Sequence, residues 1–448
     1  MQFEEMKDVL VAAAERAGIT EYEIYYQAEE DVSAETLKRE ISSFSSGAAR
    51  GVCFRCIVDG RQGYASGQLL TPDALEELVL LARSNAACVD SEDAPYIFEG
   101  SEHYEAPTED APALLSAKEI RERSLLAMER TYHESELVAD GTQCGAVSNL
   151  RRVHLYNSKG LSLSSCVGMS GVYSSAIVRR GEDAAETFEF CESGNACEIE
   201  EMSRRAVERA IAKLGGGTLP TGKYDILFDG KVFRDFLSAF SPILSAKNAQ
   251  MGLSLLANKE GETVAAPCVT LVDDPMRKGN SMKAFFDGEG VATRRRAVID
   301  HGVLTTLLYD LTTARRAGVE STGNGRKGSY ASPVAISPYN LYIEKGEASR
   351  EELLSSLKNG IFITEAKGFH AGADAVTGDF SIESAGFFIE DGKRVRPVKS
   401  FTVAGNFFDL LRGVETLGDT VHWGVPATTA YGAPDVLLRG MSVGGDGE

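Results

Sequence analysis

The segment from Gly368 to Ser384, GFHAGADAVTGDFSIES, gathers side chains that could bind a metal ion or exchange protons. One imidazole and three carboxylates lie within these seventeen residues: His370, Asp374, Asp379 and Glu383. Such a set could hold a divalent cation or supply a general acid and a general base. Either chemistry requires the side chains to meet in space, so the local structure decides whether this is a reactive centre.

A strand over residues 379–389 would separate these carboxylates. Asp379 and Glu383 would share one face of the strand but lie about 13 Å apart, because each residue advances a strand by about 3.3 Å. That separation is too large for both groups to bind one ion. His370 and Asp374 would meet only on a helix, which the glycines of this segment disfavour. The segment is therefore predicted to be a turn that leads into an amphipathic strand.

A second acidic pair occurs in FFDGEG, where Asp287 and Glu289 are flanked by glycines. The pair could bind a cation or a peptide amine, but a tight acidic turn between strands explains it more simply. The last three histidines, at positions 301, 370 and 422, lack the spacing of a metal-binding helix, and unrelated histidines are more often surface or hydrogen-bonded side chains.

The composition indicates a globular protein of two or three domains. The chain has 448 residues, of which 43% are hydrophobic and 25% charged. Its net charge of −20 argues against a nucleic-acid partner, since such partners are bound through basic patches. No apolar run of transmembrane length or signal-like N-terminus is found, so we expect a cytoplasmic protein without a membrane partner. Eight cysteines without a disulfide framework fit a reducing compartment.

The first half of the chain is predicted to contain two α+β units. Residues 1–88 form the first, with an opening helix that ends near Gly18 and a hairpin that turns at Asp59-Gly60. Residues 89–115 are acidic, carry three prolines and are predicted to be a linker. Residues 116–214 form the second unit, whose first helix begins with a capping-box pattern.

Residues 222–448 are predicted to form a β-rich C-terminal domain. The preceding GGGTLPTG is the strongest boundary in the chain, because its glycines and proline favour neither helix nor central strand. A short buried strand, KYDILFDG, and an apolar helix, KVFRDFLSAF, follow it. Glycine-containing turns then separate many short extended segments. The expected fold class is α+β, with a mixed α/β N-terminal half followed by a β-dominated C-terminal domain.

The order of these segments resembles the TldD/PmbA family. The resemblance rests on VTLVDDP, FFDGEGVATRRRAVIDHGVLTTLLYD, TTARRAGVESTGNGRKG, GIFITEAKGFHAGADAVTGDFSIESAGFFIEDGK and FTVAGNFFDLL, with GAARGVCFRCIVDGRQGYASG and LYNSKG in the first half. It implies a cytoplasmic protease system that acts on unfolded peptides, leader peptides and small unstable proteins. In that system a TldD subunit and a PmbA subunit, also called TldE, form a heterodimer around a cavity. The family is also known as modulators of DNA gyrase, although the acidic charge gives no support to direct DNA binding.

The resemblance also indicates the type of subunit. TldD-type chains carry zinc on an H-E-x-x-x-H helix and use a cysteine close to the C-terminus as a further ligand. The corresponding segment here is SAFSPI, residues 238–243, which has no histidine or glutamate and contains Pro242. The last cysteine is Cys268. The chain is therefore identified as PmbA (TldE) type, with no cofactor expected in this chain and zinc expected in a TldD-like partner.

The predicted function is that of a non-catalytic subunit of a TldD–TldE type zinc metalloprotease that processes unfolded or leader peptides. Its expected partners are a TldD-like homologous subunit, or a second copy when it is alone, and peptide substrates. The residues expected to line the chamber are Asp287, Glu289, His370, Asp374 and Asp379. Two alternatives remain open. One is a stand-alone hydrolase that uses Asp287, Glu289, Asp379 or Glu383, and the other is a peptide-binding scaffold that recruits no protease.

Overall fold

A computed structural model describes residues 1–89, 93–105, 112–192 and 194–446 of the chain. The acidic linker predicted over 89–115 lies partly outside these described residues. No helix among the described residues is long and apolar enough to cross a membrane.

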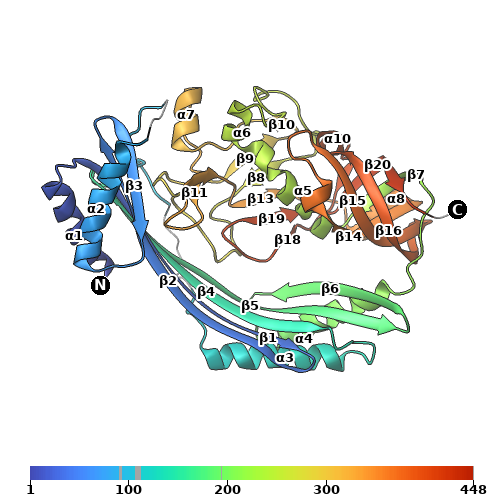
Figure 1. The fold of residues 1–448 in the computed structure, drawn as a ribbon. Coiled ribbons are helices and arrows are strands. Elements are labelled where there is room, and N and C mark those ends of the chain that lie inside the picture. Colours follow the sequence, from blue (N-terminus) through green and yellow to red (C-terminus); the bar gives the residue numbers. More distant parts are fainter. Residues whose placement is uncertain (90–92, 106–111, 193, 447–448) are drawn as a thin grey trace.

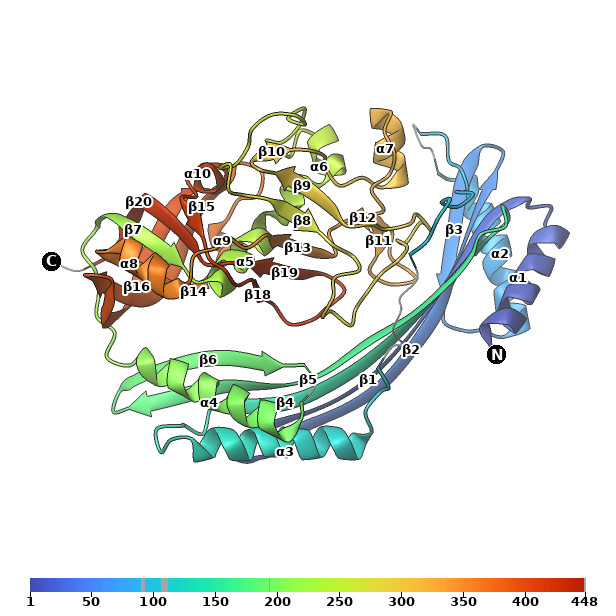
Figure 2. The same ribbon diagram turned by 180° about the vertical axis from the view of Figure 1, so that it is seen from behind.

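One six-stranded antiparallel sheet forms the N-terminal half, in the order β3-β2-β1-β4-β5-β6. Its strands are β1 (Glu21–Leu37), β2 (Glu40–Val58), β3 (Arg61–Gly67), β4 (Gln143–Asn157), β5 (Ser162–Arg180) and β6 (Asp183–Cys191). The predicted units 1–88 and 116–214 both contribute strands to it, because β1 pairs with β4 from Glu23 opposite Asn157 to Leu37 opposite Gln143. The long strands bend into an arch that runs beneath the C-terminal half (Figures 1 and 2).

Two pairs of helices cover this sheet at its opposite ends (Figure 2). Helices α1 (Phe3–Arg16) and α2 (Pro72–Ala86) lie at one end, and α3 (Ala117–His133) and α4 (Ala196–Ala212) at the other. The predicted capping box at the start of α3 is confirmed, since Ser116 and Glu119 each accept a hydrogen bond from the other's backbone N–H. The predicted hairpin turn is also present: Asp59 and Gly60 have φ of 51° and 73°, as a two-residue type I′ turn requires.

The C-terminal half contains two further six-stranded sheets and a two-stranded ribbon. One sheet has the order β16-β15-β14-β7-β20-β17, the other β10-β9-β8-β13-β19-β18, and the ribbon is β11-β12. The strands are β7 (Gly222–Phe228), β8 (Leu271–Asp273), β9 (Arg296–Asp300), β10 (Val303–Leu304), β11 (Gly325–Lys327), β12 (Val334–Ile336), β13 (Asn340–Ile343), β14 (Gly360–Lys367), β15 (Asp379–Glu390), β16 (Lys393–Asn406), β17 (Thr416–Leu417), β18 (His422–Trp423), β19 (Ala430–Ala433) and β20 (Val436–Gly444). The helices are α5 (Gly230–Phe240), a 3₁₀ turn η1 (Ser241–Leu244), α6 (Ala246–Gln250), α7 (Leu311–Ala317), α8 (Arg350–Leu357), α9 (Phe369–Gly372) and α10 (Phe407–Arg412). The expected fold class is confirmed.

Helix α5 lies between the two C-terminal sheets (Figure 1), where its apolar face enters their shared core. Phe233, Phe236 and Phe240 on that face are at most 1% exposed. Regular α-helix ends at Phe240, and the chain continues as the 3₁₀ turn that contains Pro242. Pro242 accounts for this ending, because proline lacks the N–H that an α-helix interior requires.

Candidate functional site

The carboxylates of the segment 368–384 do not converge on one another. Asp379 and Glu383 lie on the exposed face of β15, which confirms the predicted strand. The segment before it is not a turn throughout, because Phe369–Gly372 form the one-turn helix α9, which ends before Asp374 and so does not bring His370 and Asp374 together. The Asp379 carboxylate accepts a hydrogen bond from Asn406 at 2.9 Å. Asp374 is exposed and accepts the backbone N–H of Val376 at 2.8 Å, so it holds the turn that precedes the strand.

His370 lies apart from these carboxylates, in an open hollow of about 400 Å³ beside helix α5. The hollow is lined by Asp235, Ser238, Ala239, Phe369, His370 and Ala373. Burial raises the pKa of the Asp235 carboxyl above its ordinary value. No hydrogen bond links Asp235, Ser238 and His370 among the described residues, so the three do not form a connected nucleophile and base.

Two residues of the hollow, Ser238 and Ala239, belong to the segment 238–243 that the resemblance aligns with the zinc helix. Ser238 is exposed there, Ala239 carries no ligand atom, and Ile243 is 3% exposed within the apolar core. Zinc in proteins is bound by cysteine sulfur, histidine nitrogen and carboxylate oxygen. These three positions therefore do not fit a zinc ion.

Asp287 and Glu289 are neighbours in a buried turn. Asp287 is 3% exposed, and its carboxylate accepts the N–H groups of Glu289, Val291 and Gly325, each at 2.9 Å. Glu289 accepts the N–H of Leu311 at 2.9 Å, at the start of α7. Burial raises the pKa of Asp287 to about 7, and burial together with the Asp287 charge raises that of Glu289. The acidic turn predicted from the sequence is present, and both carboxyl groups are held by the backbone.

A different group of side chains comes close enough to share a metal ion. Within the described residues, Asp229, His422 and Asp435 form the one such group, with ligand atoms within 4.8 Å of one another. The two carboxylates are 1% and 3% exposed. Asp229 caps helix α5 by accepting the N–H of Lys231 at 2.9 Å, and Asp435 accepts the N–H of Gly230 at 2.8 Å.

Cationic side chains already occupy this group. Arg350 donates two hydrogen bonds to Asp435, at 2.6 and 2.7 Å, and lies 3.4 Å from Asp229. Arg209 approaches Asp229 from the other side at 3.3 Å. These guanidinium groups lower the pKa of Asp229 despite its burial, and burial lowers the pKa of His422. A cation would have to displace Arg350, so the donor types suit a metal but their surroundings do not.

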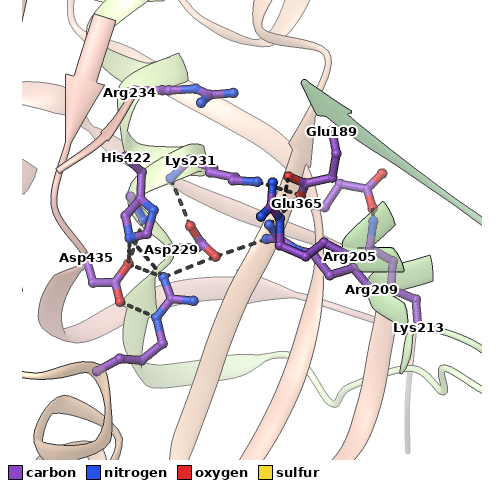
Figure 3. A network of polar contacts seen from close by, with 12 residues as sticks. Glu189, Arg205, Arg209, Lys213, Asp229, Lys231, Arg234, Glu365, His422 and Asp435 are labelled. Carbon is purple, nitrogen blue, oxygen red and sulfur yellow. Dashed lines mark hydrogen bonds and ion pairs between the residues drawn. The ribbon is translucent and has the colours of Figure 1, made fainter. Parts of the chain in front are cut away.

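The same network extends to the N-terminal half through Glu189 on β6 (Figure 3). Glu189 is 5% exposed and accepts hydrogen bonds from Arg209 at 2.7 Å and Lys231 at 2.6 Å. Arg209 belongs to α4 and Lys231 to α5, so the network connects the arched sheet and its helix α4 to the N-terminus of α5. We call this network the charged joint between the two halves; its residues are Glu189, Arg209, Asp229, Lys231, Arg350, His422 and Asp435.

Sequence reasoning did not identify this joint. Asp229, His422 and Asp435 are brought together from both ends of the C-terminal half, and no local spacing connects them. The one local signal was the Asp-Gly that ends KYDILFDG, because aspartate directly before a helix commonly caps it.

Three domain models of one family match nearly the whole chain. They are PmbA/TldA metallopeptidase domain 1 over residues 22–86, the central domain over 103–214 and the C-terminal domain over 221–445. The chain belongs to the PmbA/TldD family. The structural features above therefore describe a metalloprotease-like member of that family.

Several members of the family are similar over most of their length. A metalloprotease of Methanothermobacter thermautotrophicus is 26% identical over 430 residues, which cover 91% of each chain. Metalloprotease PmbA of Escherichia coli O157:H7 is 24% identical over 92% of this chain and 90% of its own. A TldD homologue of Haemophilus influenzae is 33% identical, but over 54% of this chain and 53% of its own.

Solved structures share the fold. A proposed modulator of a DNA gyrase from Thermotoga maritima has a TM-score of 0.88 and 32% identity, with 99% of this chain and 100% of that chain covered. TldE from Thermococcus kodakarensis has a TM-score of 0.89 at 21% identity, with 98% and 99% covered. At that identity the second likeness concerns the fold alone.

Proposed function

We propose that this chain is a PmbA/TldE-type subunit that binds unfolded or leader peptides for a zinc-carrying TldD-like partner and has no zinc centre of its own. The observation that carries the proposal is the segment 238–243, which lines the α5 hollow at Ser238 and Ala239 and enters the apolar core at Ile243. Ser238, Ala239 and Ile243 stand where the resemblance places the H-E-x-x-x-H ligands, and none of them offers a zinc ligand.

A free sheet edge supports the peptide-binding part of the proposal. Strand β3 pairs with β2 only over Val52–Val58, whereas β1 pairs with β2 from Glu40 onward. Among the described residues, the outer edge of β2 over residues 40–51 therefore has no partner strand. An extended peptide can add to such an edge through backbone hydrogen bonds, which recognise chain conformation rather than sequence. This mode suits substrates that are unfolded and varied.

The cysteines are consistent with a cytoplasmic place of action. All eight are free in the structure. Cys88, Cys166, Cys197 and Cys268 are exposed, and exposed thiols persist most readily in a reducing compartment.

Co-expression with a TldD-type chain from the same genome tests the proposal. We expect stoichiometric zinc and peptide cleavage in the pair, zinc in the TldD-type chain, and neither zinc nor cleavage in this chain alone. A chelator should abolish cleavage by the pair. Stoichiometric zinc bound to this chain alone would overturn the proposal.

The same preparations separate the two alternatives. A stand-alone hydrolase would cleave an unfolded peptide without a partner, and Asp287→Asn or Glu289→Gln would reduce that rate. A scaffold would bind the peptide but fail to co-purify with the TldD-type chain. The proposal requires co-purification and a rate for the pair above that of the TldD-type chain alone.

A further inference from the structure

A cavity of about 70 Å³ lies where the arched sheet meets the C-terminal half. One wall comes from β1, β4 and β5, and the other from residues 282–288, β11 and Tyr339, directly before β13. Its polar lining includes Tyr25, Arg151, Asp287, Arg326, Lys327 and Tyr339. A space of this size holds on the order of five water molecules or one small charged group.

Two of the cations on these walls form no ion pair with a described residue. Arg326 donates hydrogen bonds to the Pro338 carbonyl and, at 2.6 Å, to the Thr429 hydroxyl, which are both neutral groups. The Lys327 ammonium lies 4.7 Å from the centre of the Tyr25 ring. Within the described residues, neither cation has a carboxylate oxygen within 4.0 Å. This is unusual in a chain with 66 acidic and 46 basic side chains.

A further cation of the lining serves as an internal comparison. Arg151 lies 3.5 Å from the carboxylate of Glu29 and donates hydrogen bonds to Gln27 and to the Lys327 carbonyl, both at 3.1 Å. Its charge is therefore compensated by the protein. Burial lowers the pKa of Arg326, and the charge of the buried Asp273 offsets this effect only in part. An anion in the cavity would compensate Arg326 and Lys327 as Glu29 compensates Arg151.

Tyr339 adds a neutral donor to the same wall. Its side chain is 4% exposed, its ring lies 4.3 Å from the Arg326 guanidinium carbon, and its hydroxyl makes no hydrogen bond with a described residue. A buried phenol is usually hydrogen-bonded, so a bound acceptor would satisfy it. Asp287 lines the cavity too, but backbone N–H groups hold its carboxylate. Because a carboxyl group already lines the cavity, a ligand with one negative charge would be repelled less than a phosphate.

We propose that the cavity bounded by Arg326, Lys327 and Tyr339 binds a carboxylate, supplied by the free C-terminus of a peptide. A carboxylate oxygen can accept a hydrogen bond from a guanidinium, an ammonium or a phenol, which are the donor types that line the cavity, and a carboxylate fits the available volume. The peptide as its source rests on the proposed function, whereas the carboxylate chemistry rests on the cavity alone. The site would hold the C-terminal carboxylate of a bound peptide, while the rest of the peptide lies extended along the arched sheet.

Calorimetry on the full chain tests this with one hexapeptide in two forms, with a free and an amidated C-terminus. We expect the free acid to bind about tenfold more tightly or better, which corresponds to one charge-assisted interaction. Lys327→Met should remove most of that preference, and Tyr339→Phe should reduce it. Lys278→Met, an exposed site outside the cavity with the same change of charge, should preserve it.

Equal affinity for the two peptide forms, or a preference that survives in Lys327→Met, would overturn the inference. Competition by acetate separates the two sources of carboxylate. Binding of acetate with no tighter binding of the peptide acid would reject the peptide end as the ligand. The assay needs neither zinc nor a partner, so its failure is distinct from failure of the proposed function, which a rise in the partner's cleavage rate would still support.

Discussion

The carboxyl group of Asp287 accepts three backbone hydrogen bonds and yet has a raised pKa. Burial is the largest cause, and the three N–H donors, which favour the charged form, only partly offset it. The nearby charge of Asp310 raises the pKa further. A carboxylate that the backbone holds so firmly can therefore still bind a proton near neutral pH.

This shift predicts how stability depends on pH. The folded pKa of about 7 lies above the ordinary value of 3.8, so the folded protein binds more protons than the unfolded chain between these values. The free energy of unfolding should therefore decrease as pH rises from about 4 to about 7, because ionisation of Asp287 costs more in the folded protein. The decrease should be up to roughly 1 kcal/mol per pH unit. Urea unfolding at a series of pH values measures this slope.

Asp287→Asn isolates the effect from those of other carboxyl groups. The amide keeps an acceptor for the Glu289 and Val291 N–H groups but cannot titrate. The difference in unfolding free energy between wild type and variant should shrink as pH rises from 4 to 7. A constant difference over that range would show that Asp287 does not hold a proton in the folded state.

At the scale of elements, one glycine sets how closely a helix and a strand approach. A Cβ built on Gly63 of β3 would lie 2.0 Å from the carbonyl oxygen of Ala82 and 2.6 Å from the nitrogen of Ala86, both on α2. These are backbone atoms, so the helix itself would have to move. Gly63→Ala should therefore lower the free energy of unfolding by about 2 kcal/mol, as overpacking of a close contact does.

The same strand offers a matched control. At Gly67 the nearest atom to a new Cβ is the end of the Leu78 side chain, at an ordinary 3.7 Å. Gly67→Ala should leave stability within about 0.5 kcal/mol of wild type. Thermal melting of both variants measures the contrast, and similar losses at the two sites would contradict the close-contact explanation.

Local chemistry made several elements predictable from the sequence. The cap at Ser116 and the turn at Asp59-Gly60 each depend on a few neighbouring residues. The alternation of β15 could likewise be read from its side chains. A positive φ or a side-chain cap is fixed within a single turn of chain, so the residue types are sufficient to indicate it.

At the scale of the whole molecule, the same reasoning could not supply the long-range pairings. Strand β1 lies beside β4 across more than a hundred residues, and Asp229 meets Asp435 from the opposite end of its half. The cavity beside Asp287 and the ion-pair network at Asp229 arise from such pairings. Sequence spacing therefore indicated that Asp287 and Glu289 are neighbours. The charged joint at Asp229 and the cations that line the cavity beside Asp287 could be found only from the folded structure.

The charged joint gives the last prediction, which concerns how the two halves unfold. The Glu189 carboxylate accepts hydrogen bonds from both Arg209 and Lys231. Glu189→Gln would therefore leave two partly buried cations without their shared carboxylate. The free energy of unfolding should fall by about 3 kcal/mol, the cost of breaking a buried ion pair on one side. Glu201→Gln on the outer face of α4 also removes a carboxylate that pairs with two arginines, but it is exposed and should cost less than about 1 kcal/mol.

Two spectroscopic probes can show whether the joint couples the halves. Trp423, the single tryptophan, lies in the C-terminal half, whereas far-ultraviolet circular dichroism reports on both halves. In wild type the urea transitions seen by the two probes should coincide, because the network transmits the unfolding of one half to the other. In Glu189→Gln they should separate, while in Glu201→Gln they should still coincide. Coincident transitions in Glu189→Gln would mean that the remaining contacts between arch and C-terminal half suffice to make the molecule unfold as one unit.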